Sequence, residues 1–194
     1  MKISRRQSLK GFSTLASSVT ALASLASGCR LHGADNAARQ AAVEQFATGA
    51  ELSLSDGSRT YTAKAIVMPD AEWKKILSSA EYAVLRHEGT EPPFSHPLNK
   101  NKKPGLYRCA ACGTPLFRSE TKFDSGTGWP SFYAPIAKEN VTEKIDRSLG
   151  MVRIEVRCRR CDGHLGHVFE DGPRPTGLRY CMNGTALRFE ETVK

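Results

Sequence analysis

Two Cys-x-x-Cys pairs constrain the fold of this chain of 194 residues more than any other feature of its sequence. The pairs are Cys109 with Cys112 and Cys158 with Cys161, and residues 113–157 lie between them. Two residues between cysteines let both thiolates bind one ion from a tight turn, and four thiolates complete the tetrahedral shell that Zn²⁺ prefers. The pattern therefore predicts a structural zinc clamp that ties together two distant turns, with no coordination position open to water or substrate.

Other interpretations of these four cysteines stay open at this point. Two disulfide bonds or four free thiols would have the same spacing in the sequence. A redox Cys-x-x-Cys fits less well, because no βαβ pattern surrounds either pair.

The N-terminus has the features of an export signal. Residues 4–10, Ser-Arg-Arg-Gln-Ser-Leu-Lys, resemble a twin-arginine motif, with Ser8 where phenylalanine is usual. Residues 11–28 form an uncharged stretch of Ala, Ser and Leu that is too weakly apolar to be a good membrane span. Residues 26–29, Ala-Ser-Gly-Cys, resemble a lipobox, so we expect either lipid attachment at Cys29 or ordinary cleavage nearby. The expected location is the periplasm or the cell envelope.

The basic charge of the chain belongs partly to this signal. The formal net charge is +8, and removing residues 1–28 takes away four basic residues and no acidic ones, which leaves +4. The remaining basic residues are scattered. The charge therefore gives little reason to expect a nucleic-acid partner.

We predict three parts along the chain: an export signal over 1–29, a linker or loosely attached N-terminal arm over 30–67, and one domain over 68–194. The arm is rich in Ala, Gly, Ser and Thr, and one strand is expected in it at 60–68.

Two short helices are expected at the start of the domain. Asp70 is a good N-cap for a helix over 71–77. Ser78 and Glu81 have the spacing of a capping box for a second helix through about His87, which Gly89 would end. Residues 91–93, Glu-Pro-Pro, break helical structure, and the lysines at 100, 102 and 103 indicate an exposed turn.

From Leu106 onward the pattern is that of β-structure. Val152, Ile154 and Val156 alternate with charged residues, which indicates a half-buried strand. Further short strands are expected at 106–109, 115–118, 166–170, 178–183 and 186–190. The predicted class is mainly β, of the β-rich α+β kind, with a small core that a metal would help to stabilise.

Cys181 stands apart from the two pairs, in polar and basic company. Arg179 precedes it by two positions and Asn183 follows by two, so the three side chains share one face if the segment is a strand. A nearby arginine favours the thiolate, which is the reactive form. The alternative is a buried, inert cysteine that packs as a small hydrophobe.

Two more segments carry candidate functional residues. Residues 163–169, Gly-His-Leu-Gly-His-Val-Phe, place His164 and His167 beside glycines, where backbone can approach a ligand. These histidines are candidates for acid–base groups or metal ligands, or are simply surface or core residues. Residues 123–133 supply Trp129 and other aromatic rings, which would suit an apolar, sulfur-bearing group beside a thiol, or would merely belong to the core.

Together these segments resemble the methionine-R-sulfoxide reductase B family, from about Asp70 to Glu190. The two cysteine pairs match the zinc clamp of the metal-binding members of that family. The resemblance implies a peptide-methionine (R)-S-oxide reductase with two antiparallel sheets, a few short peripheral helices and structural Zn²⁺. It implies roles for seven residues outside the clamp: catalytic Cys181, His164, His167, Asn183 and Arg179, and substrate-binding Trp129 and Phe169.

The implied chemistry is attack of the Cys181 thiolate on the sulfoxide sulfur, with proton transfer to the oxygen from a histidine. Cys181 would then become a sulfenic acid. Many family members carry a resolving cysteine at the position of Thr127, so three recycling routes are open here. An external thioredoxin-like or other thiol donor is favoured over Cys29 and over a zinc-ligand cysteine. We expect a monomer whose substrate is methionine-R-sulfoxide, either in oxidised proteins or free.

Competing classes explain less of the sequence. A zinc-knuckle interaction or nucleic-acid module accounts for the four cysteines and the charge, but not for Cys181, the histidine pair or the export signal. A cysteine hydrolase built on Cys181 would need an oxyanion hole. The leading alternative is an exported zinc-knuckle binding module without catalysis, which a lack of reductase activity in the folded protein would favour.

Overall fold

The computed structural model describes residues 30–192. The expected export signal and Cys29 lie outside these residues. Within them, no helix combines the length and the apolar character needed to cross a membrane.

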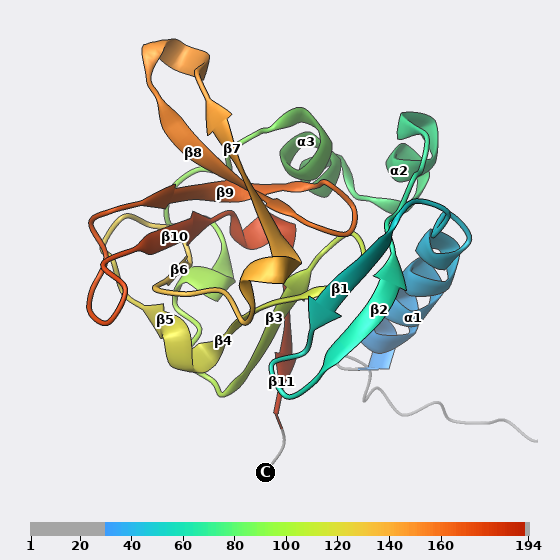
Figure 1. Cartoon of the computed structure of the whole chain (residues 1–194), viewed down its shortest axis with the longest axis horizontal. Helices are drawn as coiled ribbons and strands as arrows, with labels where there is room; N and C mark the ends of the chain where they lie inside the picture. The colour runs from blue at the N-terminus through green and yellow to red at the C-terminus, as the bar shows by residue number, and fades with distance from the viewer. Residues whose placement is uncertain (1–29, 193–194) are drawn as a thin grey trace, which may run out of the picture.

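Two antiparallel sheets form the body of the molecule (Figure 1). One has six strands in the order β5-β6-β10-β9-β8-β7, and the other has three in the order β11-β3-β4. The strands of the larger sheet are β5 (Lys122–Phe123), β6 (Ser131–Phe132), β7 (Val141–Asp146), β8 (Arg153–Cys158), β9 (His164–Phe169) and β10 (Arg179–Met182). Those of the smaller sheet are β3 (Gly105–Cys109), β4 (Pro115–Arg118) and β11 (Leu187–Glu191). The predicted β-rich class with antiparallel sheets is confirmed, and a third sheet of two strands, β1 (Glu51–Ser55) and β2 (Thr60–Lys64), accompanies these two.

The core lies between these sheets. Phe117 of β4 stacks on Phe132 of β6 with ring centroids 4.4 Å apart, and Tyr107 of β3 meets the edge of the same Phe132 ring. All three rings are fully buried. Aromatic pairs at such distances add to the stabilisation from buried area, so they hold the two sheets in a fixed relation beneath the functional residues.

Most predicted strands are present within a few residues of the expected bounds. The sequence did not reveal four other strands: β5, β6 and β7 in the larger sheet, and β1 in the N-terminal arm. The pair β7–β8 extends away from the body as a projecting hairpin (Figure 1). Ile145 and Val152 near its tip are 62 % and 68 % exposed, so alternation of apolar residues there does not mark a buried face.

The two predicted helices are α2 (Asp70–Ile76) and α3 (Ser79–His87). The capping box of Ser78 and Glu81 is confirmed, with both reciprocal hydrogen bonds formed. The other cap assignments were wrong by one residue. Pro69 is the N-cap of α2 and Asp70 is its first helical residue, and Glu88, in the left-handed conformation with φ 55°, ends α3 before Gly89. Apart from a helix in the N-terminal arm, the other helical elements of the described residues are single 3₁₀ turns.

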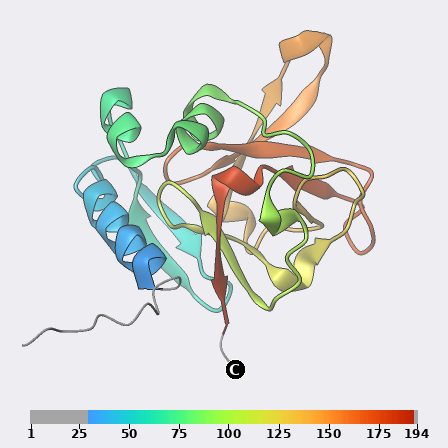
Figure 2. The same cartoon turned by 180° about the vertical axis from the view of Figure 1, so that it is seen from behind.

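The described part of the expected N-terminal arm is folded onto the domain. It contains α1 (Arg30–Glu44) and a hairpin of β1 (Glu51–Ser55) and β2 (Thr60–Lys64), which lie beside each other in both views (Figures 1 and 2). Val43 and Leu54 are fully buried, and the backbone N–H of Ile66 donates to the Arg160 carbonyl at 2.8 Å. The expectation of loose attachment therefore needs correction, because small residues here form a helix and a hairpin that share the core.

Candidate active site

Cys181 lies near the centre of the six-stranded sheet. It is on β10, directly opposite His167 of β9 on one side and Ser131 of β6 on the other. Residues paired across antiparallel strands project from the same face. The sheet therefore brings a thiol, an imidazole and a hydroxyl together from segments that are far apart in the sequence.

A cleft of about 130 Å³ opens beside this thiol. Five residues that the sequence singled out line the cleft: Trp129, His167, Phe169, Cys181 and Asn183. Thr90, Arg153 and Gly166 complete its wall. His164 and Arg179 do not line the cleft. Both side chains are buried.

His164 and His167 come together because β9 is irregular. In a regular strand, residues three apart point to opposite faces. Here the register of β8 and β9 shifts between Val156 and Arg157, and such a bulge re-aims side chains. The two imidazole rings are consequently 5.4 Å apart between centroids.

Each imidazole is held by a carboxylate. Nδ1 of His164 lies 2.6 Å from Oε1 of Glu155, and Nε2 of His167 lies 2.8 Å from Oδ2 of Asp146. Burial lowers the pKa of His164, against the opposing effect of Glu155. Nε2 of His164 is buried with no hydrogen-bond partner. A buried polar atom of this kind normally serves a water or a ligand, so this nitrogen has capacity for a further hydrogen bond.

Arg179 lies close to Cys181 but does not control its ionisation. Its guanidinium forms two hydrogen bonds of 2.8 Å to Asp171 and lies 4.4 Å above the Phe169 ring. Burial raises the pKa of the Cys181 thiol, and the attraction of Arg179 only partly offsets that rise. The sequence argument identified the neighbour correctly but omitted the desolvation of the thiolate, which is the larger effect.

The hydroxyl of Thr127 lies beside the Cys181 thiol. Its Oγ1 is 3.9 Å from the Cys181 Sγ and 2.8 Å from Oγ of Ser125. Ser125 in turn contacts Oγ of Ser131 at 2.7 Å. A short chain of hydroxyls thus reaches the thiol, and its hydrogen bonds offset part of the rise in the Cys181 pKa that burial causes.

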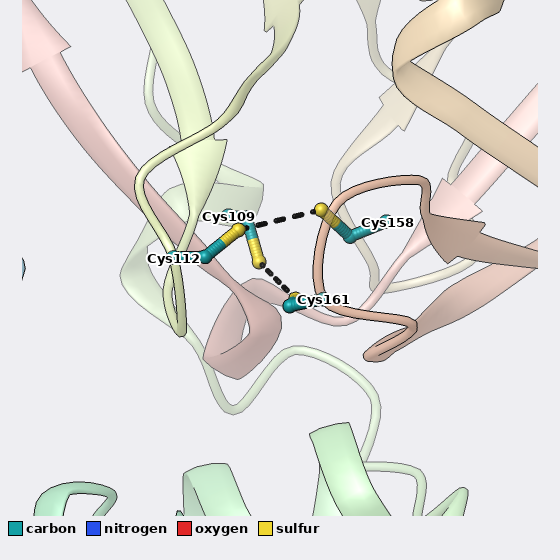
Figure 3. Close-up of side chains that lie close together, drawn as sticks. All are labelled: Cys109, Cys112, Cys158 and Cys161. Carbon is teal, nitrogen blue, oxygen red and sulfur yellow. Dashed lines mark hydrogen bonds between the residues drawn. The ribbon is translucent and has the colours of Figure 1, made fainter. Parts of the chain in front are cut away.

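The four remaining described cysteines form a separate buried cluster, which Figure 3 shows in close-up. The Sγ atoms of Cys109 and Cys161 are 3.7 Å apart, and those of Cys112 and Cys158 are 3.5 Å apart. These distances are too long for disulfide bonds, whose sulfurs lie about 2.05 Å apart. They match the ~3.8 Å edge of a tetrahedron with metal–sulfur bonds of ~2.3 Å. The donor set and its geometry therefore fit a structural metal site.

The cluster joins the two sheets. The first cysteine of each pair is the last residue of a strand, β3 in the three-stranded sheet or β8 in the six-stranded sheet, and the second lies in the turn that follows. In each turn, the residue after the second cysteine has a left-handed backbone, with φ 71° at Gly113 and 53° at Asp162. The two turns are thus local repeats of one conformation that converge on one point.

Comparison with known proteins places this arrangement in a family. Residues 77–191 match the SelR domain. Peptide methionine sulfoxide reductase MsrB from Herminiimonas arsenicoxydans is 54 % identical over 127 residues, which cover 66 % of this chain and 93 % of that protein. MsrB from Methanosarcina barkeri is 58 % identical over 127 residues, or 66 % of this chain and 89 % of that protein. The chain belongs to the methionine sulfoxide reductase B family.

The match to the SelR domain begins at residue 77, so α1, β1 and β2 precede the family region of this MsrB chain. These elements contact both cysteine turns. Arg39 donates to the Ala110 carbonyl at 3.2 Å, and Arg160 forms an ion pair with Glu44 at 2.8 Å. Ala110 and Arg160 are inner residues of the two Cys-x-x-Cys pairs.

Sequence reasoning missed several residues of this site, and Glu91 is the one with the most contacts to its walls. Glu91 was noted only as part of a helix-breaking stretch. Its backbone N–H donates to Oδ1 of Asn183 at 3.1 Å, and its carbonyl accepts from Nε1 of Trp129 at 3.0 Å. Its carboxylate accepts from the backbone N–H groups of Gly184 and Thr185 at 2.7 and 2.8 Å. Glu91 therefore fixes two walls of the cleft at once, and no pattern within the sequence signals that.

Proposed function

We propose that this chain reduces methionine-R-sulfoxide to methionine, with Cys181 as the nucleophile. Membership of the family supports the enzyme class, which is peptide-methionine (R)-S-oxide reductase. One observation carries the assignment to this site: Cys181 shares a cleft of side-chain size with the ring of Trp129 and with the polar groups of His167 and Asn183. A sulfoxide carries both a methyl group and an oxygen on its sulfur, so a reductase needs an apolar wall and a polar one around a thiol.

The first step joins the Cys181 sulfur to the sulfoxide sulfur. The thiol gives up its proton, and the sulfoxide oxygen gains one. The new sulfur–sulfur bond and the substrate's sulfur–oxygen bond then break, as the oxygen bonds to the Cys181 sulfur and methionine leaves. The products are methionine and a cysteine sulfenic acid. Because burial disfavours the free thiolate of Cys181, a neighbouring base that accepts the thiol proton would promote the attack.

The histidines are proposed to move these protons. His167 lines the cleft, and Asp146 fixes the orientation of its ring. Nδ1 of His164 is hydrogen-bonded to Glu155, and its Nε2 is buried without a hydrogen-bond partner. A water molecule bound to Nε2 could relay a proton from His164 to the substrate oxygen. Asn183 is fixed by Glu91 and by the Leu165 carbonyl, and it would hold that oxygen with its remaining amide N–H.

Recycling of the sulfenic acid needs two further thiol groups, which become a disulfide as water is released. Thr127 has no thiol, so we propose that an external thioredoxin-like or other thiol donor reduces Cys181 directly. Zn²⁺ held by Cys109, Cys112, Cys158 and Cys161 would supply structural stability alone, since four thiolates leave no open coordination position. On the basis of residues 1–29, we further propose that the enzyme is exported to the cell envelope, where oxidised proteins would be its substrates. We also propose that it is a monomer.

The experiment that tests the function compares the two epimers of methionine sulfoxide, free and within a peptide, with dithiothreitol as the reductant. We expect turnover of the R epimer and none of the S epimer, because a cleft that fixes both methyl and oxygen selects one configuration. Formation of methionine is measured by chromatography. If folded, zinc-loaded protein reduces neither epimer, the function is wrong and a non-catalytic zinc-knuckle binding module becomes the better interpretation.

Introducing a thiol at Thr127 should change how the enzyme recycles. In Thr127→Cys, the new thiol would lie close to Cys181, because Oγ1 of Thr127 is already 3.9 Å from the Cys181 Sγ. We expect this variant to form a disulfide with Cys181 after one turnover with sulfoxide. Mass spectrometry of peptides without added reductant measures the product, and Thr127→Ser is the matched control that should stop at the sulfenic acid. Detection of sulfenic acid alone in Thr127→Cys would show that the thiols cannot meet.

A further inference from the structure

A groove near the cleft is larger than the cleft itself, with a volume of about 520 Å³ against about 130 Å³. We call it the lysine groove. It is lined by three lysines, two aromatic rings and four other polar residues: Lys100, Lys102, Lys122, Phe94, Phe123, Asn99, Asn101, Ser119 and Asp124. The sequence indicated only an exposed turn for Lys100 and Lys102.

One loop separates the lysine groove from the reactive thiol. Phe123 and Asp124 at the start of this loop line the groove. Thr127 and Trp129 further along it contact Cys181 and line the cleft, respectively. A polypeptide with one side chain beside Cys181 therefore has to cross only this loop to reach the groove.

Phe94 presents an unusual apolar surface at this position. Its side chain is 62 % exposed, and its backbone has φ 62°, a region that bulky residues rarely adopt. A hydrogen bond of 2.7 Å from its N–H to the Gly128 carbonyl ties it to the loop beside the cleft. Unfavourable backbone conformations of this kind are found preferentially at binding and catalytic sites.

The charge of the lysine groove is positive. Lys100 and Lys102 are exposed, and among the described residues neither forms an ion pair. The Lys122 ammonium donates to the Asn99 carbonyl at 2.7 Å, and Asp124 attracts its charge without forming an ion pair with it. Asp124, which accepts a hydrogen bond from the Gly126 N–H at 3.0 Å, is the one carboxylate among the lining residues.

We propose that the lysine groove binds the polypeptide segment next to the methionine sulfoxide, and that it favours substrates with acidic residues in that segment. This proposal rests on the proposed function and names its substrate class. The cleft has room for a side chain only, so the rest of a protein substrate must lie on the adjoining surface. Three lysines complement acidic side chains, and the exposed ring of Phe94 offers an apolar contact beside them.

The test uses three substrates: a peptide with acidic residues around methionine-R-sulfoxide, the same peptide with lysines instead, and N-acetyl-methionine-R-sulfoxide amide. For each enzyme variant, kcat/KM on a peptide is divided by kcat/KM on the amide. We expect wild type to prefer the acidic peptide, mainly through a lower KM, and to lose that preference as salt concentration rises. Lys100→Glu combined with Lys102→Glu should reduce the acidic-peptide ratio roughly five- to tenfold, as expected for two exposed ion pairs.

The matched control combines Lys64→Glu with Lys138→Glu, which changes the net charge equally at exposed lysines outside the groove. It should keep the wild-type preference. The proposal is overturned if wild type reduces the amide but does not distinguish the peptides, or if both double variants lose the preference alike. If folded, zinc-loaded wild type does not reduce even the amide, the proposed function itself fails.

Discussion

Cys181→Ser should lower kcat/KM for methionine-R-sulfoxide by at least about 10⁴-fold, the scale on which loss of a nucleophile acts in covalent catalysis. A serine hydroxyl is far less acidic than a thiol and cannot form a sulfenic acid, so both the attack and the oxygen transfer are lost. The position tolerates serine, because the thiol is only partly buried and Thr127 already places a hydroxyl 3.9 Å from it. Steady-state assays with dithiothreitol, run beside wild type, measure the loss.

Measurements of the fold of Cys181→Ser show whether its loss of activity has a structural cause. Cys181→Ser should retain the wild-type metal content and melting temperature, because the cysteine cluster is formed by four other residues. Its mass after sulfoxide treatment should be unchanged, whereas wild type treated without reductant should gain one oxygen. Activity of the variant within tenfold of wild type would exclude Cys181 as the nucleophile.

Local sequence patterns predicted the elements that depend on local physics. The capping box of Ser78 and Glu81 needs only neighbours three residues apart. The alternation around Val156 follows from the two-residue period of a strand, and Val156 is fully buried. The convergence of the cysteine pairs was predictable because two such spacings together favour one shared metal ion.

Other features depend on tertiary contacts that no window of sequence contains. His164 and His167 share a site only because a bulge changes the register of β8 and β9. Glu91 organises Trp129 and Asn183 through its backbone, so its side-chain type says nothing about that role. The N-terminal arm was underestimated because its small residues carry little apolar signal.

The ionisation of Cys181 illustrates a different limit. The sequence places Arg179 beside the thiol, and one opposite charge lowers a thiol pKa. Burial acts in the other direction and is the larger effect here. The balance between them depends on how much solvent reaches the sulfur, which is a property of the packed structure.

Cys109→Ser should abolish metal binding and lower the melting temperature by more than about 10 °C, or prevent folding altogether. Structural Zn²⁺ in small sites contributes about 10–16 kcal/mol of apparent free energy, which equals or exceeds the usual total stability of a domain at about 5–15 kcal/mol. The cluster also joins the two sheets, so its loss removes the metal-mediated cross-link between them. Metal content by mass spectrometry and thermal unfolding, with and without chelator, measure both effects.

Cys181→Ser is the matched control here as well, since it makes the same chemical change at a cysteine outside the cluster. If Cys109→Ser melts like wild type and purified wild type contains no metal, the cluster is a set of free thiols and the metal assignment is wrong. If chelation unfolds wild type and Cys181→Ser equally, while Cys109→Ser is already unfolded, the five described cysteines divide into a stabilising cluster and one reactive thiol. That division explains why the reactive sulfur lies in an open cleft while the other four are buried, because only a reactive thiol must meet both substrate and reductant.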